Sequence, residues 1–250
     1  MPLPLTREQP VIRQLPKPIP TPGPVPIDRG NIKVALRLAP PLPVDVAPKL
    51  RTLYIKLIKR PMESAVCLSI GVFALPLLFC SCIAIGIEQR SFRKLIYSQD
   101  RLGRNRRKFR IHKLRTMKLD AEADGPAFSS GASDLRITTV GRFLRRYRID
   151  ELPQLWNVIR GDMALIGPRP ERPEFCARIE SCLPEFAQRL MVRPGITGWA
   201  QVNHGYVGAN LRGHADKLRF DLEYIESLTL GRDLRILART VTSVLAGQGQ

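Results

Sequence analysis

A run without a formal charge, residues 64–87, constrains this chain more than any other feature of its sequence. Its 24 residues are enough for a helix that crosses the roughly 30 Å hydrocarbon core of a bilayer. Pro76 lies in the middle of the run and removes a backbone hydrogen bond there. Basic residues flank both ends, whereas a single span usually has them mainly on one side. The residues therefore favour a re-entrant helix that enters and leaves one leaflet, and they leave a kinked spanning helix open.

The charge of the chain points to an anionic partner. The formal net charge is +18, and residues 51–118 around the apolar run carry +13 of it. Charge concentrated beside an apolar run favours membrane lipids as a partner over nucleic acid, which we do not expect this chain to bind. Five cysteines form no metal-binding or disulfide pattern, so we expect a reducing compartment.

The composition divides the chain into three parts. Residues 1–50 hold 13 of the 22 prolines and predict a disordered tail, without the apolar stretch of a secretory signal peptide. Residues 51–95 contain the membrane helix with its basic flanks. Residues 96–250 are long enough for one folded domain of ordinary size with a core of its own.

Residues 97–118 predict a β-hairpin. Gly103 and Asn105 give a turn signal between two short stretches with apolar residues. Lys113 and Arg115 are two positions apart, so in a strand they point to the same side and are candidates for a phosphate site. A basic face in contact with lipid headgroups is the alternative.

Two adjacent carboxylates, Asp150 and Glu151, lie between clusters of arginines. The apolar positions after them have helical spacing and predict one buried helix face, made of Leu152, Leu155, Trp156 and Ile159. Taken alone, the pair is most simply a helix cap followed by a solvated charge. A carboxylate kept ionised by a helix N-terminus and arginines is also able to attack phosphorus. A second carboxylate beside it is able to hold Mg²⁺.

The remaining segments give weaker expectations. Two prolines fix Arg169 in a rigid loop, either as a turn residue or as a phosphate ligand. Residues 173–190 predict two helices separated at Pro184, and residues 193–203 predict a loop in which Trp199 has several possible roles. Two further helices follow, one carrying Asp221 and one over residues 233–245. The sequence does not decide whether the last helix lies in the membrane interface or packs on the domain.

The three histidines show no metal-binding spacing, and the sequence has no phosphate-binding loop, dinucleotide, serine-hydrolase or zinc-protease motif. Several long motifs, in order, do resemble the bacterial sugar transferases, which are monotopic polyprenyl-phosphate phosphoglycosyltransferases. They are RLGRN at 101–105, FRIHKLRTM at 109–117, DELPQLWN at 150–157, RGDM at 160–163, GPRP at 167–170 and PGITGWAQVN at 194–203. The resemblance runs from about residue 56 to residue 245 and leaves the proline-rich tail outside.

The resemblance implies a fold that is mainly α with minor β. It also implies a monotopic membrane protein at the cytoplasmic face of the inner membrane, with a re-entrant helix broken at Pro76 and interfacial amphipathic helices on the catalytic domain. The implied reaction transfers a sugar-1-phosphate from a nucleotide sugar, usually a UDP-sugar, to polyprenyl phosphate such as undecaprenyl phosphate. UMP leaves, and the product starts exopolysaccharide or O-antigen assembly.

The resemblance implies that Asp150 is the catalytic nucleophile, which forms a covalent phosphosugar intermediate, and that Glu151 holds the Mg²⁺ cofactor. With Arg115 added from the strand pattern, the residues expected to bind substrate or phosphate are Arg145, Arg169, Lys113, Arg115 and Asp221. Arg148 departs from the family, whose members usually carry Ser or Thr there. A catalytically silent scaffold of a polysaccharide assembly complex is the alternative. The sugar and the oligomeric state, a homo-oligomer included, stay open.

Overall fold

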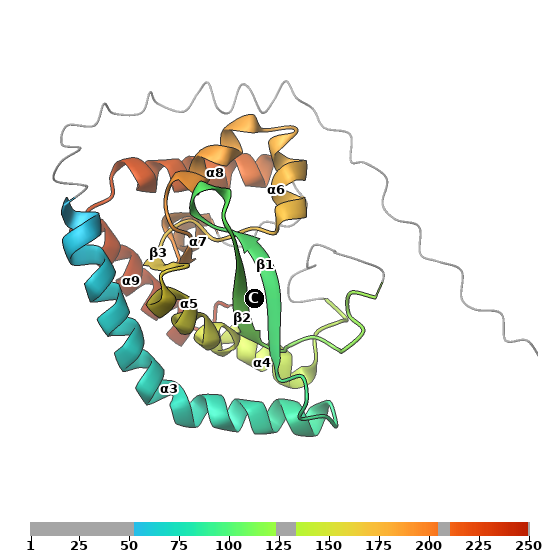
Figure 1. Cartoon of the computed structure of the whole chain (residues 1–250). Helices are drawn as coiled ribbons and strands as arrows, with labels where there is room; N and C mark the ends of the chain where they lie inside the picture. Colours follow the sequence, from blue (N-terminus) through green and yellow to red (C-terminus); the bar gives the residue numbers. More distant parts are fainter. Residues whose placement is uncertain (1–52, 124–133, 205–210, 250) are drawn as a thin grey trace, which may run out of the picture.

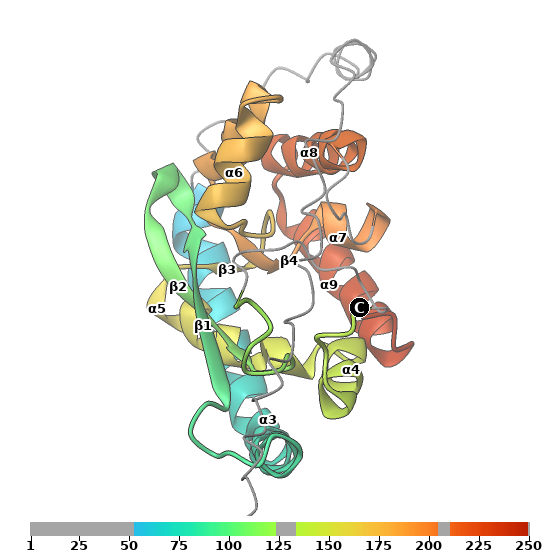
Figure 2. The same ribbon diagram turned by 90° about the vertical axis from the view of Figure 1, so that its right-hand side faces the viewer.

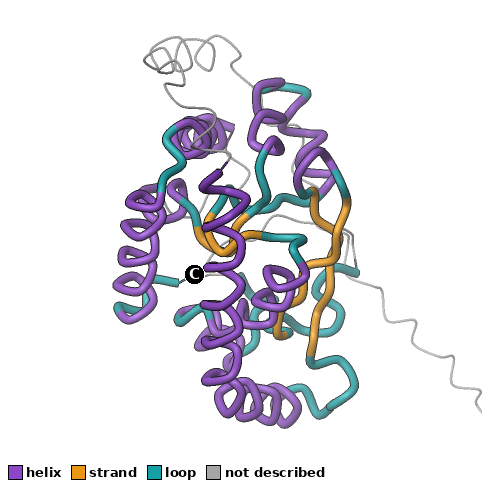
Figure 3. The backbone as a smooth tube through the Cα atoms, turned by 60° about the vertical axis from the view of Figure 1, so that its left-hand side comes forward, coloured by secondary structure: helices purple, strands orange, loops and turns teal. Residues whose placement is uncertain are grey.

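The computed structural model describes residues 53–123, 134–204 and 211–249. It is mainly helical with two small sheets, and Figure 3 shows the short strands lying among the helices. The predicted mainly α fold with minor β structure is therefore confirmed. The proline-rich tail, residues 1–50, lies outside the described residues, and the division of the chain at residue 95 stays a prediction.

The apolar run forms the long helix that begins the described structure. The π-helical turn η1 (Tyr54–Lys59) leads into α3 (Arg60–Glu88), which contains Pro76. Figure 1 shows α3 bent into two arms, so the predicted break is a bend within one continuous helix. Many of its large apolar side chains are exposed: Leu68, Val72, Phe73, Leu75, Phe79 and Ile87. Of the helices described, the one over Leu57–Glu88 is long and apolar enough to cross a membrane.

A buried polar network fixes the beginning of this helix to the rest of the protein. Lys59 Nζ lies 2.8 Å from Glu63 Oε1 and 2.6 Å from Asp233 Oδ2. Tyr224 OH donates to Asp233 Oδ1 at 2.8 Å, and Glu63 Oε1 accepts a hydrogen bond from the backbone N–H of Ile166 at 3.0 Å. The three side chains Lys59, Glu63 and Asp233 are buried, and the two carboxylates share Lys59 as their cation.

The predicted β-hairpin is present. Strands β1 (Ile96–Leu102) and β2 (Lys108–Leu114) pair antiparallel, with Tyr97 opposite Lys113. The connecting turn contains the 3-10 segment η2 (Arg104–Arg106), in which Asn105 has a φ of 55°. Asparagine adopts this left-handed conformation more readily than most residues, which explains the turn signal in the sequence.

The segment with the two carboxylates is helical, although its buried face differs from the prediction. Helix α4 (Thr139–Arg146) is followed by the 3-10 helix η4 (Ile149–Gln154) and by α5 (Leu155–Arg160). Leu155 is buried as predicted, but Trp156 is 56% exposed and Asn157 is buried instead. The prediction for Trp156 was wrong because the 3-10 turns before it rotate the side chains away from the α-helical spacing.

The predicted loop at residues 193–203 is also wrong, because this segment contains a strand and a helix. Strand β4 (Gly195–Thr197) pairs in parallel with β3 (Ala164–Ile166), and α7 (Trp199–His204) follows. The strands approach closely: a Cβ on Gly195 would lie 2.1 Å from the backbone nitrogen of Gly167. Three-residue strands with glycines have too weak a sequence signal to be predicted alone.

The C-terminal helices complete the fold. The predicted separation at Pro184 is confirmed, since α6 (Pro173–Glu180) ends before the 3-10 helix η5 (Pro184–Met191). Helices α8 (Leu211–Glu226) and α9 (Leu230–Leu245) follow. Figure 2 shows α8 beside α6 at one end of the molecule, and α9 leading toward α4.

The last helix packs on the domain, which is one of the two arrangements that the sequence left open, and it also has an exposed apolar face. Asp233 and Ile236 of α9 are buried against the domain. A stripe of apolar side chains on the same helix is exposed: Leu230, Leu234, Val241 and Leu245. They are four or seven residues apart, which is one or two helical turns, so they give α9 an apolar surface alongside its packed face.

We predict that Asp233→Ala destabilises the protein strongly. The substitution removes one of the two carboxylates that contact Lys59. It also removes the buried carboxylate that accepts hydrogen bonds from Tyr54 OH and Tyr224 OH. Breaking a buried pair from one side costs about 3–5 kcal/mol, or roughly 6–20 °C in Tm for a domain of this size. Thermal unfolding in detergent measures it. Asp100→Ala, at an exposed ion pair, is the control, and an equal Tm for both variants would contradict the prediction.

Candidate active site

A cavity of about 650 Å³ lies between the hairpin, η4, the loop after β3, and the C-terminal helices. Alternation along the two strands places six side chains of the hairpin on its wall: Tyr97, Gln99, Arg101, Ile111, Lys113 and Arg115. Asp150, Glu151 and Arg169 line it from other elements. The hairpin thus presents one face to the residues for which the sequence suggested chemistry.

Asp150 and Glu151 lie in the first turn of η4 and are only 5% and 7% exposed. Arg148, just before this turn, has a left-handed backbone with φ 54° and ψ 21°, which separates η4 from α4. Pro153 is accommodated inside η4. The pair is therefore a buried helical turn, and Glu151 is not the solvated surface charge that a lone Asp-Glu pair would suggest.

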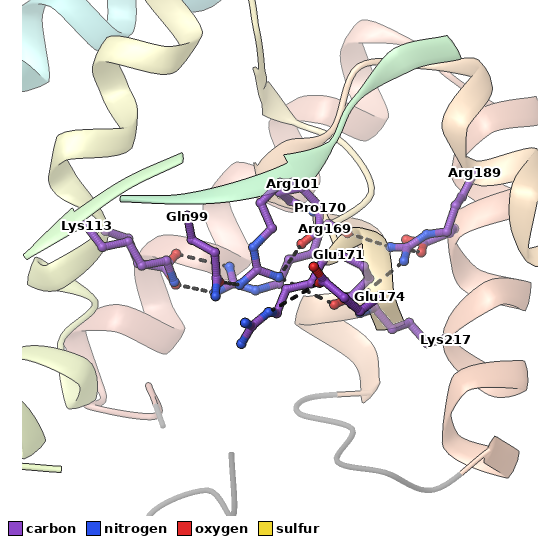
Figure 4. A network of polar contacts seen from close by, with 12 residues as sticks. Gln99, Arg101, Lys113, Arg169, Pro170, Glu171, Glu174, Arg189 and Lys217 are labelled. Carbon is purple, nitrogen blue, oxygen red and sulfur yellow. Dashed lines mark hydrogen bonds and ion pairs between the residues drawn. The ribbon is translucent and has the colours of Figure 1, made fainter. Parts of the chain in front are cut away.

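Two cations hold the Glu151 carboxylate. Arg169 donates from Nη1 to Oε2 at 3.1 Å and from Nη2 to Oε1, and Lys113 Nζ donates to Oε1 at 3.1 Å. Burial alone would raise the pKa of Glu151, but the charges of Arg169 and Lys113 hold it well below its usual range. Glu151 is thus ionised and fixed in orientation. Lys113 comes from the hairpin and Arg169 from the loop after β3, and both are labelled in the polar network of Figure 4.

The Asp150 carboxylate is held differently. Among the described residues, none makes a hydrogen bond or an ion pair with it. Burial raises the pKa of Asp150 to about 6, against the opposing charge of Lys113, while the neighbouring charge of Glu151 adds to the rise. This carboxyl is mostly ionised at neutral pH. It is therefore a buried anion whose oxygen atoms are not committed to any side chain that the structure describes, as a nucleophile requires.

The predicted phosphate-binding cations converge on the same cavity. Arg145, Arg115, Lys113 and Arg169 all line it. Arg145 donates from Nε to Thr116 Oγ1 at 2.9 Å, and its charge lowers the pKa of Asp150. The structure thus brings these four candidates together around the carboxylate pair.

Asp221 is the exception. It does not line the cavity, is 2% exposed, and lies 2.8 Å from Arg189 Nη2. Arg189 Nη2 in turn donates to the backbone carbonyl of Arg169 at 2.8 Å. Asp221 therefore supports the loop that carries Arg169 from outside the cavity, and its role in binding substrate stays a prediction.

A second ionic cluster was missed from the sequence. Glu171, two residues after Arg169, lies 2.6 Å from Lys217 Nζ and 3.7 Å from Arg101 Nη1 (Figure 4). Burial would raise the pKa of Glu171, but the charges of Lys217, Arg189 and Arg101 lower it strongly. The position of Glu171 directly after the proline-flanked arginine was the one available sequence signal. Its partners come from β1, η5 and α8, so only the folded chain assembles them.

The residues of the pair fit a Mg²⁺ ion that is held mainly by its substrate. Within the described part of the chain, no group of three or more metal-binding side chains occurs. Mg²⁺ commonly takes one or two carboxylates and completes its coordination with water and substrate phosphates. Glu151 accepts three hydrogen bonds and keeps further lone-pair capacity on Oε2, and Asp150 lies next to it.

Comparisons with known proteins show which family this chain resembles. The family model described as bacterial sugar transferase matches residues 54–247. A UDP-glucose:undecaprenyl-phosphate glucose-1-phosphate transferase of Caulobacter vibrioides is 39% identical over 230 residues, covering 88% of this chain and 79% of that protein. A UDP-N-acetylgalactosamine-undecaprenyl-phosphate N-acetylgalactosaminephosphotransferase of Aeromonas hydrophila is 40% identical over 193 residues, covering 77% of this chain and 44% of that protein.

A UDP-glucose:undecaprenyl-phosphate glucose-1-phosphate transferase of Escherichia coli is 35% identical over 188 residues, covering 74% of this chain and 40% of that protein. This chain therefore spans less than half the length of the Aeromonas and Escherichia relatives. The match to the family model includes the hairpin, the Asp150-Glu151 turn and α9, which together surround the cavity. This chain belongs to the bacterial sugar transferase family.

Proposed function

We propose that this protein transfers a sugar-1-phosphate from a nucleotide sugar to undecaprenyl phosphate, as the first membrane step of exopolysaccharide or O-antigen type glycan assembly. The observation that carries the proposal is the Asp150 carboxylate, buried and uncommitted, on the wall of a cation-lined cavity. The names of the relatives support the same donor and acceptor classes.

Asp150 is the nucleophile of this proposal. Its carboxylate oxygen attacks the phosphorus that bears the sugar, and the bond from that phosphorus to the bridging oxygen breaks. UMP leaves with the electron pair, and the sugar-phosphate stays on Asp150 as an acyl phosphate. An oxygen of undecaprenyl phosphate then attacks the same phosphorus and releases the carboxylate. Dividing the transfer in this way replaces one difficult step by two easier ones.

The surrounding cations suit this chemistry. Arg145 and Arg115 line the cavity with Lys113 and Arg169, so phosphate oxygens that enter it meet fixed positive charge. Charges held in place before the reaction stabilise the transition state without reorganisation. The ion pairs of Glu151 with Arg169 and Lys113 set the positions of two of these cations.

Mg²⁺ belongs to the proposal as the cofactor. Glu151, next to Asp150, is the residue that would hold it. When bound, the ion would neutralise charge on the diphosphate of the donor.

The proposed location is the cytoplasmic face of the inner membrane, with α3 as a re-entrant helix. The bend of α3 at Pro76 and its exposed apolar side chains support insertion into one leaflet. Arg60 at one end, and Arg90 and Arg93 at the other, are exposed basic residues suited to anionic headgroups. The apolar stripe of α9 supports its placement as an interfacial helix.

The identity of the sugar is not part of the proposal. The relatives differ in this respect, since two are named for glucose and one for N-acetylgalactosamine. Their names share the undecaprenyl-phosphate acceptor, and a UDP-sugar donor is proposed on the same basis. A panel of UDP-sugars is therefore the appropriate substrate set for the tests below.

Asp150→Asn is expected to abolish transfer, because an amide cannot form the acyl phosphate. Activity, measured as UMP release with undecaprenyl phosphate present, should fall by at least about 10³-fold. Intact-protein mass spectrometry of the wild type with donor alone should show a sugar-phosphate adduct that the variant lacks. Asp100→Asn, at an exposed carboxylate, is the control. Undiminished turnover by Asp150→Asn would sink the assignment, and absence of UMP release by the wild type with every donor would sink the function.

Glu151→Gln is expected to raise the Mg²⁺ concentration needed for half-maximal activity by about 10–100-fold, because a neutral amide binds the ion more weakly than a carboxylate. Glu174→Gln, at an exposed side chain, is the matched control. A Mg²⁺ titration of Glu151→Gln that overlays the wild-type curve would leave Glu151 only the role of holding Arg169 and Lys113.

The re-entrant helix predicts that both of its flanks lie on the cytoplasmic side. Cysteines placed at Leu53 and Arg93 in a cysteine-free background should escape a membrane-impermeant maleimide in intact spheroplasts and react after lysis. Pro76→Leu restores the missing backbone donor and is expected to increase labelling of one flank from outside. Labelling of either flank in intact spheroplasts of the parent protein would show that α3 crosses the membrane.

A further inference from the structure

Arg148 combines a strained backbone with a position on the wall of the active-site cavity. Its φ of 54° is in the left-handed region, which is unfavourable for a residue with a large side chain. Four described residues other than glycine have a positive φ: Arg90, Asn105, Arg106 and Arg148. Of these four, Arg148 is the one that lines the cavity.

The backbone of Arg148 connects two helical segments. Its N–H donates to the carbonyl of Arg145 at 3.0 Å, and its carbonyl accepts from the N–H of Glu151 at 3.1 Å. Residue 148 thus ends α4 and begins the turn that carries Asp150. Glycine or asparagine would adopt this conformation more easily, so the backbone alone gives no reason for an arginine.

The guanidinium of Arg148 differs from those of the other arginines on the cavity wall. Eight described arginines line the cavity: Arg101, Arg115, Arg136, Arg145, Arg148, Arg169, Arg172 and Arg239. Seven of them donate to a carboxylate, an amide, a hydroxyl or a backbone carbonyl. Arg148 makes no such bond with any residue that the structure describes.

An uncommitted charge in such a place is costly. The Arg148 side chain is partly buried, and burial lowers its pKa, although an arginine stays protonated. A partly desolvated cation without a partner loses hydration and gains no hydrogen bond in return. An anion that enters the cavity would supply the missing partner.

The excess of positive charge around the carboxylate pair also favours binding of an anion at Arg148. Four cations interact electrostatically with Asp150 and Glu151: Lys113, Arg145, Arg148 and Arg169. They exceed the two carboxylates by two charges, and without Arg148 the excess would be one. Lys113 and Arg169 are already engaged by Glu151, and Arg145 donates from Nε to Thr116 Oγ1. Of the four cations, Arg148 is the one whose guanidinium makes no hydrogen bond or ion pair with a described residue.

We propose that Arg148 is a further phosphate-binding residue of this site, whose guanidinium binds oxygen atoms of a substrate phosphate beside Asp150. The inference rests on the proposed function. Planar guanidinium groups bind phosphate oxygens in a bidentate manner, and an arginine with all its donors available is well suited to do so. The phosphate belongs either to the donor diphosphate or to the lipid acceptor, because both must approach Asp150.

Three substitutions separate the charge of Arg148 from its backbone. R148G removes the charge and relieves the strain of the left-handed backbone, whereas R148Q removes the charge and keeps that strain. R148K keeps a positive charge but lacks the planar guanidinium that binds phosphate in a bidentate manner. Arg142→Gln, at an exposed position of α4, is the matched control. We expect R148G and R148Q to lose about 10–100-fold in activity, R148K to lose less, and Arg142→Gln to match the wild type.

The two half-reactions are transfer of the sugar-phosphate to Asp150 and its transfer from Asp150 to undecaprenyl phosphate. Measured separately, they show which phosphate Arg148 binds. UMP release in a single turnover without acceptor reports the donor, and kcat/KM for undecaprenyl phosphate at saturating donor reports the acceptor. A loss in the first assigns Arg148 to the donor diphosphate, and a loss confined to the second assigns it to the lipid phosphate. Added guanidinium ion should restore part of the activity of R148G, which a merely structural role would not allow.

Several results would overturn the proposal. The first is wild-type rates for R148G and R148Q in both half-reactions. The second is a loss of activity confined to R148Q. The third is a loss of activity in R148G that added guanidinium does not restore and that is accompanied by a lower Tm. In each case the wild type still releases UMP, so the proposed function stands. If the wild type itself releases no UMP with any donor, the proposed function fails, and this inference fails with it.

Discussion

The buried carboxylate of Glu151 is the group on which the site depends. A charge in this position would be strongly unfavourable without Arg169 and Lys113, which meet it from two other parts of the chain. The three residues therefore join the hairpin, the 3-10 turn η4 and the loop after β3 at one point. Because Glu151 is neutralised by its own partners, the adjacent Asp150 is left as the uncommitted anion of the cavity.

A second set of buried charges joins this site to the apolar helix. Glu63 of α3 accepts a hydrogen bond from Ile166 N, at the end of the strand that continues directly into the loop carrying Arg169. Lys59 connects Glu63 with Asp233 of α9. The helix that carries the exposed apolar surface is thus fixed relative to the cavity by compensated charges. Such an arrangement suits the proposed transfer, in which a soluble donor and a lipid acceptor meet at one depth.

Local features were predictable, and features that depend on packing were not. The turn signal at Asn105 and the interruption at Pro184 follow from backbone conformations that few other residues share, so the hairpin and the division of α6 from η5 were predicted correctly. The burial of Trp156 was predicted wrongly because an α-helical period was applied to a segment that begins as a 3-10 helix. The short parallel pair β3–β4 has its partners about 30 residues apart, and neither strand has a period long enough to recognise.

The sequence by itself determined the chemistry that is available: an uncharged run with a central proline, two adjacent carboxylates and a set of arginines and lysines in ordered motifs. Residue type and spacing along the chain carry that information directly. Only the tertiary structure decided which charged side chains form ion pairs with one another and which do not. Glu151 pairs with Arg169 and Lys113, and Asp221 forms a supporting ion pair with Arg189. The Arg148 side chain has no hydrogen-bond or ion-pair partner among the described residues. The physical reason is that compensation of a buried charge depends on distances of a few ångströms between segments far apart in sequence.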